Sequence, residues 1–217
     1  ELVLCGMLLA SRNVPAALTW AKGLTEDVSK TVEKGKSQFA GHEILGKTLG
    51  IVGLGAIGRK VAEAAKALGM NIVGYDPYYV SGGEGLTVYP DLAEMLPLCD
   101  IVTLHLPAND ATRGMVNKEF LASMKDGAIL LNFSRDKLVN DVDLLVALES
   151  GKLTQYVTDF PNDNLIGREH ITLLPHLGAS TAEAEDNCAT MAVMELRDYF
   201  ENGNIINSVN FPKVDMG

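Results

Sequence analysis

Short apolar runs alternate with amphipathic stretches along most of the chain, and this alternation predicts its secondary structure. Apolar runs predict strands at residues 48–53, 71–75, 101–106, 128–133, 156–159 and 171–174. Helical spacing predicts helices at residues 56–68, 91–96, 117–124, 141–149 and 181–201. Several strands are apolar at nearly every position, which is typical of strands buried on both faces. The sequence therefore predicts an α/β fold with a doubly wound parallel sheet.

The first 47 residues do not follow this alternation. Residues 2–22 are rich in Leu, Met and Ala and predict a helix, which Pro15 should bend or restart. Their apolar start resembles a signal-peptide core, but an acidic residue and no basic leader precede it, so we favour a buried helix. Residues 25–47 are polar and weakly periodic, and they predict a loop or arm.

Composition and charge narrow the classes of partner. Of the 217 residues, 47% are hydrophobic and 21% charged, a globular balance in a chain long enough for one or two domains. The net charge of −10 disfavours nucleic acid and membrane surfaces as partners. Three widely spaced cysteines predict free thiols in a reducing compartment and no metal site. No apolar run approaches the ~20 residues of a membrane span, so we expect a cytoplasmic protein.

Three glycines lie between the first predicted strand and the helix after it, in the pattern Gly53-x-Gly55-x-x-Gly58. The first would permit a tight turn, the second would let a pyrophosphate approach the backbone, and the third would let the helix pack on the sheet. The N–H groups that begin the helix, near Ala56 and Ile57, would bind the anion. The pattern predicts a dinucleotide site, and the alternative is a glycine turn that binds nothing.

Asp76 ends the second strand, 23 residues after Gly53. A carboxylate at that place receives both ribose hydroxyls of a dinucleotide. Pro77 and two tyrosines follow it, and no Arg or Lys stands there to neutralise a 2′-phosphate, so NAD is favoured over NADP. The alternative interpretation makes Asp76 an ordinary residue at the end of a strand.

The later strands also end in candidate cofactor contacts, because ligands of such sheets bind beyond the carboxyl ends of the strands. We expect His105 to line the cofactor without transferring a proton. The candidates are, at the end of the strand predicted over residues 101–106, His105, Leu106 and Pro107, and at the end of the strand predicted over residues 128–133, Asn132, Phe133 and Ser134.

Together with Asp159-Phe160 and the run Pro175-His-Leu-Gly-Ala-Ser-Thr181, these motifs resemble the D-2-hydroxyacid dehydrogenase family. The resemblance extends from Glu1 to about Pro212, and it implies a Rossmann-type NAD-binding domain. The stretch 202–212 is similar to the end of this domain in short phosphoglycerate dehydrogenases, where a regulatory ACT domain often follows. Further cofactor contacts are implied at Thr112, Asp159, His176 and Gly178.

The resemblance implies three catalytic groups. Arg135 would bind the substrate carboxylate through two parallel hydrogen bonds. His176 would take the proton from the C2 hydroxyl, since an imidazole exchanges protons near neutral pH. The family orients this histidine with a Glu, but the stretch from Asp159 to Asp163 is shorter here and lacks one. Either Asp163 is the orienting carboxylate, or the pair is missing.

Four further positions stay open at the level of sequence. Asp136 stands where the family usually has Gly, and it would either compete with the substrate for Arg135 or point to solvent. We expect Asp159 to lie near the nicotinamide amide rather than near the histidine. Lys137 and Arg168 are local candidates for contacts to a substrate phosphate.

The resemblance implies hydride transfer between a 2-hydroxyacid and NAD, with 3-phosphoglycerate, at the entry to serine biosynthesis, as the leading substrate. Glycerate, lactate or glyoxylate, and a non-catalytic NAD-sensing corepressor, are the alternatives.

In domain terms, residues 1–203 would be the NAD-binding domain, with the long helix 181–202 at its end and a linker at 204–217. A preceding substrate domain would be missing, so this chain alone should turn over poorly. The helix and arm at residues 1–45 would embrace a second subunit in a homodimer, or else pack on the chain's own sheet.

Overall fold

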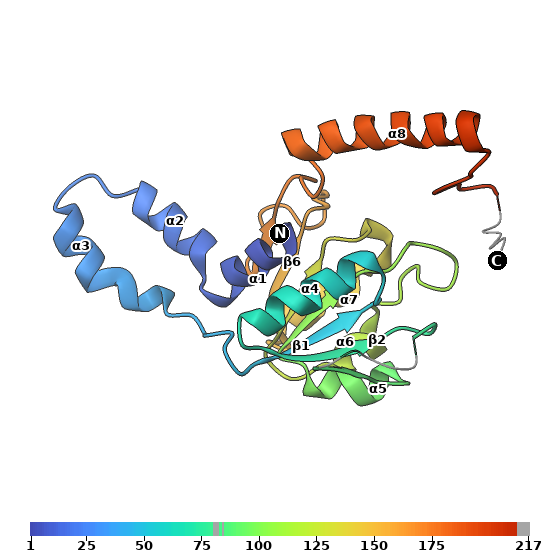
Figure 1. The fold of residues 1–217 in the computed structure, drawn as a ribbon. Helices are drawn as coiled ribbons and strands as arrows, with labels where there is room; N and C mark the ends of the chain where they lie inside the picture. The colour runs from blue at the N-terminus through green and yellow to red at the C-terminus, as the bar shows by residue number, and fades with distance from the viewer. Residues whose placement is uncertain (80–82, 84, 212–217) are drawn as a thin grey trace. The chain divides into compact units, whose positions relative to one another are not determined.

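Seven strands form one parallel sheet in the computed structural model, which describes residues 1–79, 83 and 85–211 (Figure 1). Neighbouring strands follow the order β3-β2-β1-β4-β5-β6-β7, and every pair is parallel. This order confirms the predicted doubly wound α/β fold. The strands are β1 (Thr48–Val52), β2 (Asn71–Tyr75), β3 (Leu86–Val88), β4 (Ile101–Leu104), β5 (Ala128–Asn132), β6 (Leu153–Thr158) and β7 (Ile171–Leu173).

Helices cover both faces of the sheet, which explains why its strands are apolar on both sides. One buried cluster joins the strands to α1 and α4, and the other joins them to α5, α6 and α7. Adjacent strand residues face opposite clusters: Ile101 lies in the first and Val102 in the second. The helices are α1 (Leu2–Ser11), α4 (Ala56–Ala67), α5 (Leu92–Met95), α6 (Lys118–Ser123) and α7 (Asp141–Glu149), with short 3-10 helices at η2 (Leu96–Leu98) and η3 (Asp136–Leu138).

The helix predicted over residues 2–22 is two helices, α1 and α2 (Val14–Lys22), bent by 73°. The break falls at Asn13, whose φ of 52° is left-handed, and Pro15 lies in the first turn of α2. In the described ranges no single helix has the length and apolarity to cross a membrane. The bent pair α1 and α2 together would have enough of both, judged by length and composition alone.

Residues 25–47 were predicted to be a loop or arm, and their middle part is helical rather than a loop. The segment contains α3 (Val28–Gly35) and η1 (Lys36–Phe39). α3 is short and has only two apolar residues, Val28 and Val32, which are too few to recognise as a helix in the sequence. Tertiary packing supports it instead, because the ring centroids of Trp20 and Phe39 lie 5.2 Å apart. With α2, these elements form an arm that extends away from the sheet (Figure 1).

One strand was missed by the prediction, and another begins well before its predicted start. β3 was not predicted, since it has only three residues and pairs with β2 alone at the edge of the sheet. β6 begins at Leu153, three residues before the predicted start, because the pairing with β5 continues through the polar residues Thr154 and Gln155. A register shift between Ala128 and Ile129 lies opposite this extension.

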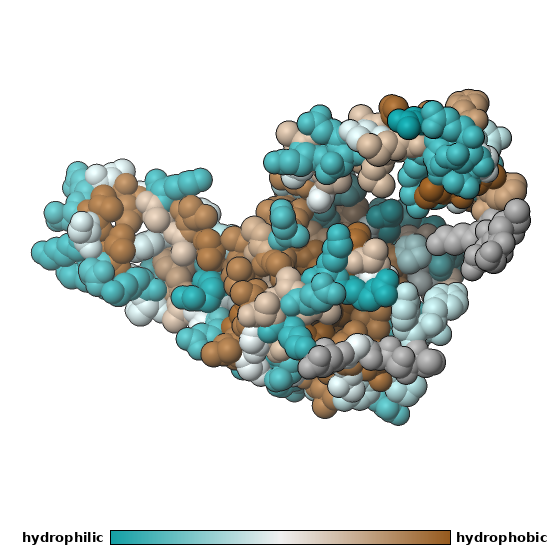
Figure 2. Space-filling view, viewed as in Figure 1, coloured by the Kyte–Doolittle hydropathy of each residue, from teal (hydrophilic) through white to brown (hydrophobic). Residues whose placement is uncertain are grey.

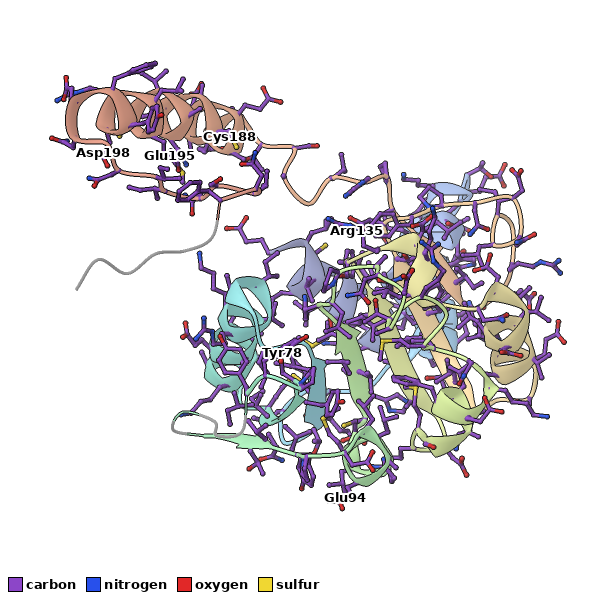
Figure 3. The ribbon with its side chains drawn as sticks, turned by 90° about the vertical axis from the view of Figure 1, so that its right-hand side faces the viewer. Tyr78, Glu94, Arg135, Cys188, Glu195 and Asp198 are labelled. Carbon is purple, nitrogen blue, oxygen red and sulfur yellow. The ribbon has the colours of Figure 1, made fainter. Side chains whose placement is uncertain are left out.

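Residues 177–217 form a compact unit of their own, separate from residues 1–176. It contains α8 (Ala182–Asn202), which begins at the N-cap Thr181 and ends at Gly203 with a φ of 76°, as predicted. The described part of the predicted linker packs on this helix through Asn204 to Asp198 and Asn207 to Glu195, two acidic residues labelled in Figure 3. Residues 212–217 lie outside the described residues, and the predicted domain extent of 1–203 stays a prediction.

Candidate cofactor and active site

Nearly all of the predicted site residues follow the carboxyl end of a strand. Because the strands are parallel and adjacent, these residues lie along one edge of the sheet. Figure 3 shows Arg135 in the loops beyond the sheet, where β5 ends. The residues that follow successive strands are Gly53 after β1, Asp76 after β2, His105 after β4, Arg135 after β5, Asp159 after β6 and His176 after β7.

The glycine turn has the geometry that its pattern predicts. Gly53 has a φ of 101°, and a side chain there would collide with the carbonyl of His105. A Cβ on Gly58 would collide with the carbonyl of Gly53, so this glycine lets α4 begin directly beneath the turn. A Cβ on Gly55 would meet nothing within 4 Å, which leaves open space beside the backbone for a ligand.

The first turn of α4 is free to bind an anion. Gly55 is the N-cap and provides no side-chain hydrogen bond, and the first turn contains no acidic residue. The first N–H groups of a helix have no partner within the helix. The exposed backbone at Ala56 and Ile57 therefore presents unpaired donors and the positive end of the dipole.

Asp76 is fixed by two backbone donors. Its Oδ2 accepts a hydrogen bond of 2.8 Å from the N–H of Leu54, and its Oδ1 accepts one of 2.9 Å from Tyr78. A carboxylate has about four acceptor positions, so this arrangement orients the group and leaves positions for two hydroxyls. The first bond also ties β2 to the glycine turn.

His105 is held beside the turn in its neutral form. Its backbone N–H donates to the carbonyl of Val52 at 2.7 Å, and its ring Nε2 lies 3.0 Å from the hydroxyl of Thr103. Burial lowers the pKa of His105 to about 4. At neutral pH the ring is uncharged, and an imidazole with so low a pKa accepts a proton poorly. This supports the prediction that His105 does not transfer the proton.

Several candidate contacts hold the loops together through their own hydrogen bonds. The Ser134 hydroxyl donates to the carbonyl of Leu106 at 2.5 Å, joining the loops after β4 and β5. The Thr112 hydroxyl donates to the carbonyl of Pro107 at 2.5 Å and closes the loop between them. The ring of Phe133 packs toward α1, since a Cβ on Gly6 would lie 2.5 Å from it.

Asn132 organises the loop that carries Arg135. It is fully buried, and its amide donates to the carbonyl of Arg135 at 2.9 Å while its Oδ1 accepts from Ser134. The Arg135 side chain is exposed, and its Nη1 donates to the carbonyl of Ser134 at 2.6 Å. Among the described residues it forms no ion pair with Asp136, so that carboxylate does not occupy the guanidinium.

Asp159 is a buried carboxylate with an unpartnered oxygen. The residue is 1% exposed, and its Oδ1 has no hydrogen-bond partner in the part of the chain that the structure describes. Burial raises the pKa of Asp159 above its ordinary value of 3.8, and the charge of nearby His176 offsets part of that rise. An orphaned acceptor at this depth fits a ligand donor such as the nicotinamide amide, so the chain's residues fit NAD at both ends of the site.

His176 lies against an aromatic ring rather than against the predicted carboxylate. The centroids of Phe160 and His176 are 4.8 Å apart, with the rings tilted by 56°. In the part of the chain that the structure describes, no hydrogen bond or ion pair joins Asp163 to His176. The neighbours of Asp163, Asn162 and Asn164, instead donate to Asp141 on α7 at 3.1 and 3.0 Å. An orienting role for Asp163 stays a prediction.

Sequence reasoning missed two neighbours of the site. Phe160, a motif residue in the sequence, contacts the ring of His176. The Cζ of Arg59 lies 5.4 Å from the centroid of the Tyr79 ring, in the turn that follows Asp76. Both contacts join different elements, so chain order gave no signal for them.

Two further predictions concern the second unit and metals. Gly178 belongs to the unit of residues 177–217, and its cofactor contact stays a prediction. Within residues 1–79, 83 and 85–211, no group of three or more His, Cys, Asp or Glu side chains is placed to hold a metal ion.

Residues 4–178 match the profile of the D-isomer specific 2-hydroxyacid dehydrogenase, NAD binding domain. The D-3-phosphoglycerate dehydrogenase of Methanocaldococcus jannaschii is 35% identical over all of this chain and 42% of its own length. The enzyme of that name from Haemophilus influenzae is 37% identical over the whole chain and 53% of its own length. The chain thus spans about half the length of these relatives or less.

Solved structures agree with this assignment. A glyoxylate reductase from Paecilomyes thermophila has a TM-score of 0.81 and 30% identity, over 96% of this chain and 63% of its own. The apo D-mandelate dehydrogenase of Rhodotorula graminis has a TM-score of 0.82 and 27% identity, over 91% of this chain and 60% of its own. The chain belongs to the D-isomer specific 2-hydroxyacid dehydrogenase family, and it contains that family's NAD-binding domain.

Proposed function

We propose that this chain is the NAD-binding part of an NAD-dependent D-2-hydroxyacid dehydrogenase that oxidises 3-phosphoglycerate in serine biosynthesis. The proposal rests on the ionisable side chains that lie at one edge of the sheet. Arg135, Asp159 and His176 follow the three adjacent strands β5, β6 and β7, on the same edge as the glycine turn. A substrate held there lies next to the nicotinamide end of the cofactor.

Each of the two catalytic side chains has a separate task. The exposed guanidinium of Arg135 binds the substrate carboxylate, since its planar fork matches the two oxygens. A nitrogen of the His176 ring takes the proton of the C2 hydroxyl, and Phe160 restricts the tilt of that ring. When bound, NAD supplies the hydride acceptor.

The substrate is proposed from the relatives. The two relatives named above and the rat and human proteins at 37% and 36% identity are all called D-3-phosphoglycerate dehydrogenase. Another 2-hydroxyacid is the second candidate, because the solved structures include a glyoxylate reductase and a D-mandelate dehydrogenase.

The test uses the protein expressed from its full reading frame. NADH formation is followed with 3-phosphoglycerate, glycerate and lactate, in wild type and in His176→Ala. Removing a general base should lower the rate by about 10²- to 10⁴-fold. His42→Ala, an exposed histidine before β1, is the matched control and should leave the rate unchanged. Equal rates for His176→Ala and wild type would refute the assignment, and a preference for glycerate or lactate would replace the substrate.

We further propose that the arm mediates a homodimer. Helices α2 and α3 have nine and eight residues and no buried residue, and helices this short are not stable in water without packing. Leu18 and Val28 on them are 50% and 48% exposed, and apolar atoms are visible over the arm (Figure 2). A second copy would cover this surface through two-fold symmetry.

Sedimentation of wild type and Leu18→Asp at micromolar concentration tests the dimer. The substitution should convert a dimer into a monomer, whereas Ser29→Asp, an exposed polar position on the same arm, should not. A monomeric wild type would refute the proposal.

A cytoplasmic location is proposed as well. The three cysteines are free, as is usual in a reducing compartment.

A further inference from the structure

A cation lies over the turn that follows β2. Arg59 is the fourth residue of α4, and its guanidinium carbon lies 5.4 Å from the centroid of the Tyr79 ring. An arginine at this distance over a tyrosine ring is attracted to the ring electrostatically. Both side chains come from segments that border the dinucleotide site: the helix whose N-terminus faces the pyrophosphate, and the turn after Asp76.

The turn brings the ring and the acid together. The N–H of Tyr79 donates to the carbonyl of Asp76 at 3.2 Å, and the N–H of Tyr78 donates to its Oδ1 at 2.9 Å. Tyr78 is 90% exposed and makes no ring contact among the described residues. Tyr79, at 38% exposure, is therefore the aromatic residue of this turn that holds Arg59.

Arg59 and Asp76 are not paired with each other. In the described ranges no ion pair joins them, and the oxygens of Asp76 accept backbone N–H groups instead. The site thus holds the two features that usually separate cofactor preferences, an acid for a ribose 2′-hydroxyl and an arginine for a 2′-phosphate. The negative charge of Asp76 repels a 2′-phosphate, while the cation beside it is available to bind one.

We propose that Arg59, positioned by Tyr79, is a latent 2′-phosphate contact, and that the carboxylate of Asp76 alone excludes NADP. The inference rests on the NAD site described above and goes beyond it. The identity of residue 76 decides between the two cofactors because the arginine is already in place. One substitution at residue 76 should therefore admit NADP without any added basic residue.

The test is calorimetric titration of NAD⁺ and NADP⁺ into wild type, Asp76→Ser, Asp76→Ser/Arg59→Ala and Asp76→Ser/Lys60→Ala. Asp76→Ser should bind NADP⁺ more tightly than wild type does. Adding Arg59→Ala should weaken NADP⁺ binding by about 10- to 100-fold, the usual range for a hydrogen bond to a charged group, and change NAD⁺ binding little. Lys60, the next residue on α4 and also exposed, is the matched control and should matter for neither cofactor.

Tyr79→Leu in the Asp76→Ser background separates positioning from charge. It removes the ring but keeps the arginine, so it should lose part of the gain in NADP⁺ affinity. Asp76→Asn, which keeps the size of the side chain, replaces Asp76→Ser if that variant does not fold. NADP⁺ affinity that is indifferent to Arg59, or equal for Arg59→Ala and Lys60→Ala, would overturn the inference. Failure of wild type to bind NAD⁺ would instead refute the cofactor site itself.

Discussion

Replacing Asp159 by Asn should stabilise the chain without cofactor and weaken its binding of NAD. Asp159 is 1% exposed, and among the described residues its Oδ1 has no hydrogen-bond partner, so the folded chain holds a carboxylate oxygen that has lost water without gaining a hydrogen bond. Asparagine has nearly the same size and no charge. The substitution therefore removes the cost of burying an ion and leaves the packing intact.

The expected gain follows from the usual cost of a buried unpaired group, roughly 1–3 kcal/mol and more when the group is charged. Because asparagine keeps part of that cost, we expect a gain of about 1–2 kcal/mol in the free energy of unfolding. For a chain of about 200 residues this raises the melting temperature by about 2–8 °C. Thermal and urea unfolding without NAD, at neutral pH, measure both quantities.

The pH dependence identifies the cause. The pKa of Asp159 is raised in the folded chain above its ordinary value of 3.8, so between the two values the folded state binds more protons than the unfolded state. The stability of wild type must then fall as pH rises through this interval. The advantage of Asp159→Asn should be complete above the folded pKa of Asp159, and it should shrink as pH falls toward 3.8.

With NAD bound, wild type should be more stable than Asp159→Asn. A ligand that binds the folded state raises stability by an amount that grows with its affinity, and wild type offers the amide a charged acceptor. Asp163→Asn is the control, because that carboxylate is exposed and its loss should change stability by less than about 0.5 kcal/mol. An advantage of Asp159→Asn that persists at pH 3.8, or an unchanged response to NAD, would refute the reasoning.

Three further predictions follow from single groups. Gly53→Ala should destabilise the chain by about 1–3 kcal/mol in urea unfolding, since φ is 101° there, whereas Gly55→Ala, where space is open, should retain stability and weaken NAD binding in calorimetry. His105→Gln should reduce the loss of stability as pH falls from 6.5 to about 4, because the unfolded chain binds a proton that the buried ring does not; identical pH profiles would contradict this. The Cys99 thiol, with a pKa raised by burial to about 12, should react with a disulfide reagent only after unfolding, while the other two cysteines react in the folded chain.

The sequence by itself predicted the parallel sheet, and it placed most site residues at one edge of that sheet. Strands and helices with clear periods were predicted to within a few residues, and parallel strands place whatever follows them on one side. Gly53 and Asp76 were therefore located by chain order, whereas Arg135 and His176 were singled out by the resemblance to the family. The sequence also predicted the roles of Gly53 and Gly58. A left-handed turn and a close contact between helix and turn both require a residue without a side chain.

The prediction of local structure from sequence failed for the shortest elements. The helix α3 and the edge strand β3 are short, and neighbouring elements rather than their own sequences stabilise them. Isolated segments of this length carry too few apolar positions to distinguish a helix or strand from a loop.

Only the tertiary structure decided which side chains are neighbours. It placed Phe160 rather than Asp163 against His176, left Asp136 unpaired with Arg135, and brought Arg59 to Tyr79. The two ring contacts depend on how segments that are distant in the chain pack together, and the Arg135–Asp136 outcome depends on the conformation of one loop. A sequence specifies the order of residues along the backbone, whereas the distance between two side chains is a property of the folded sheet.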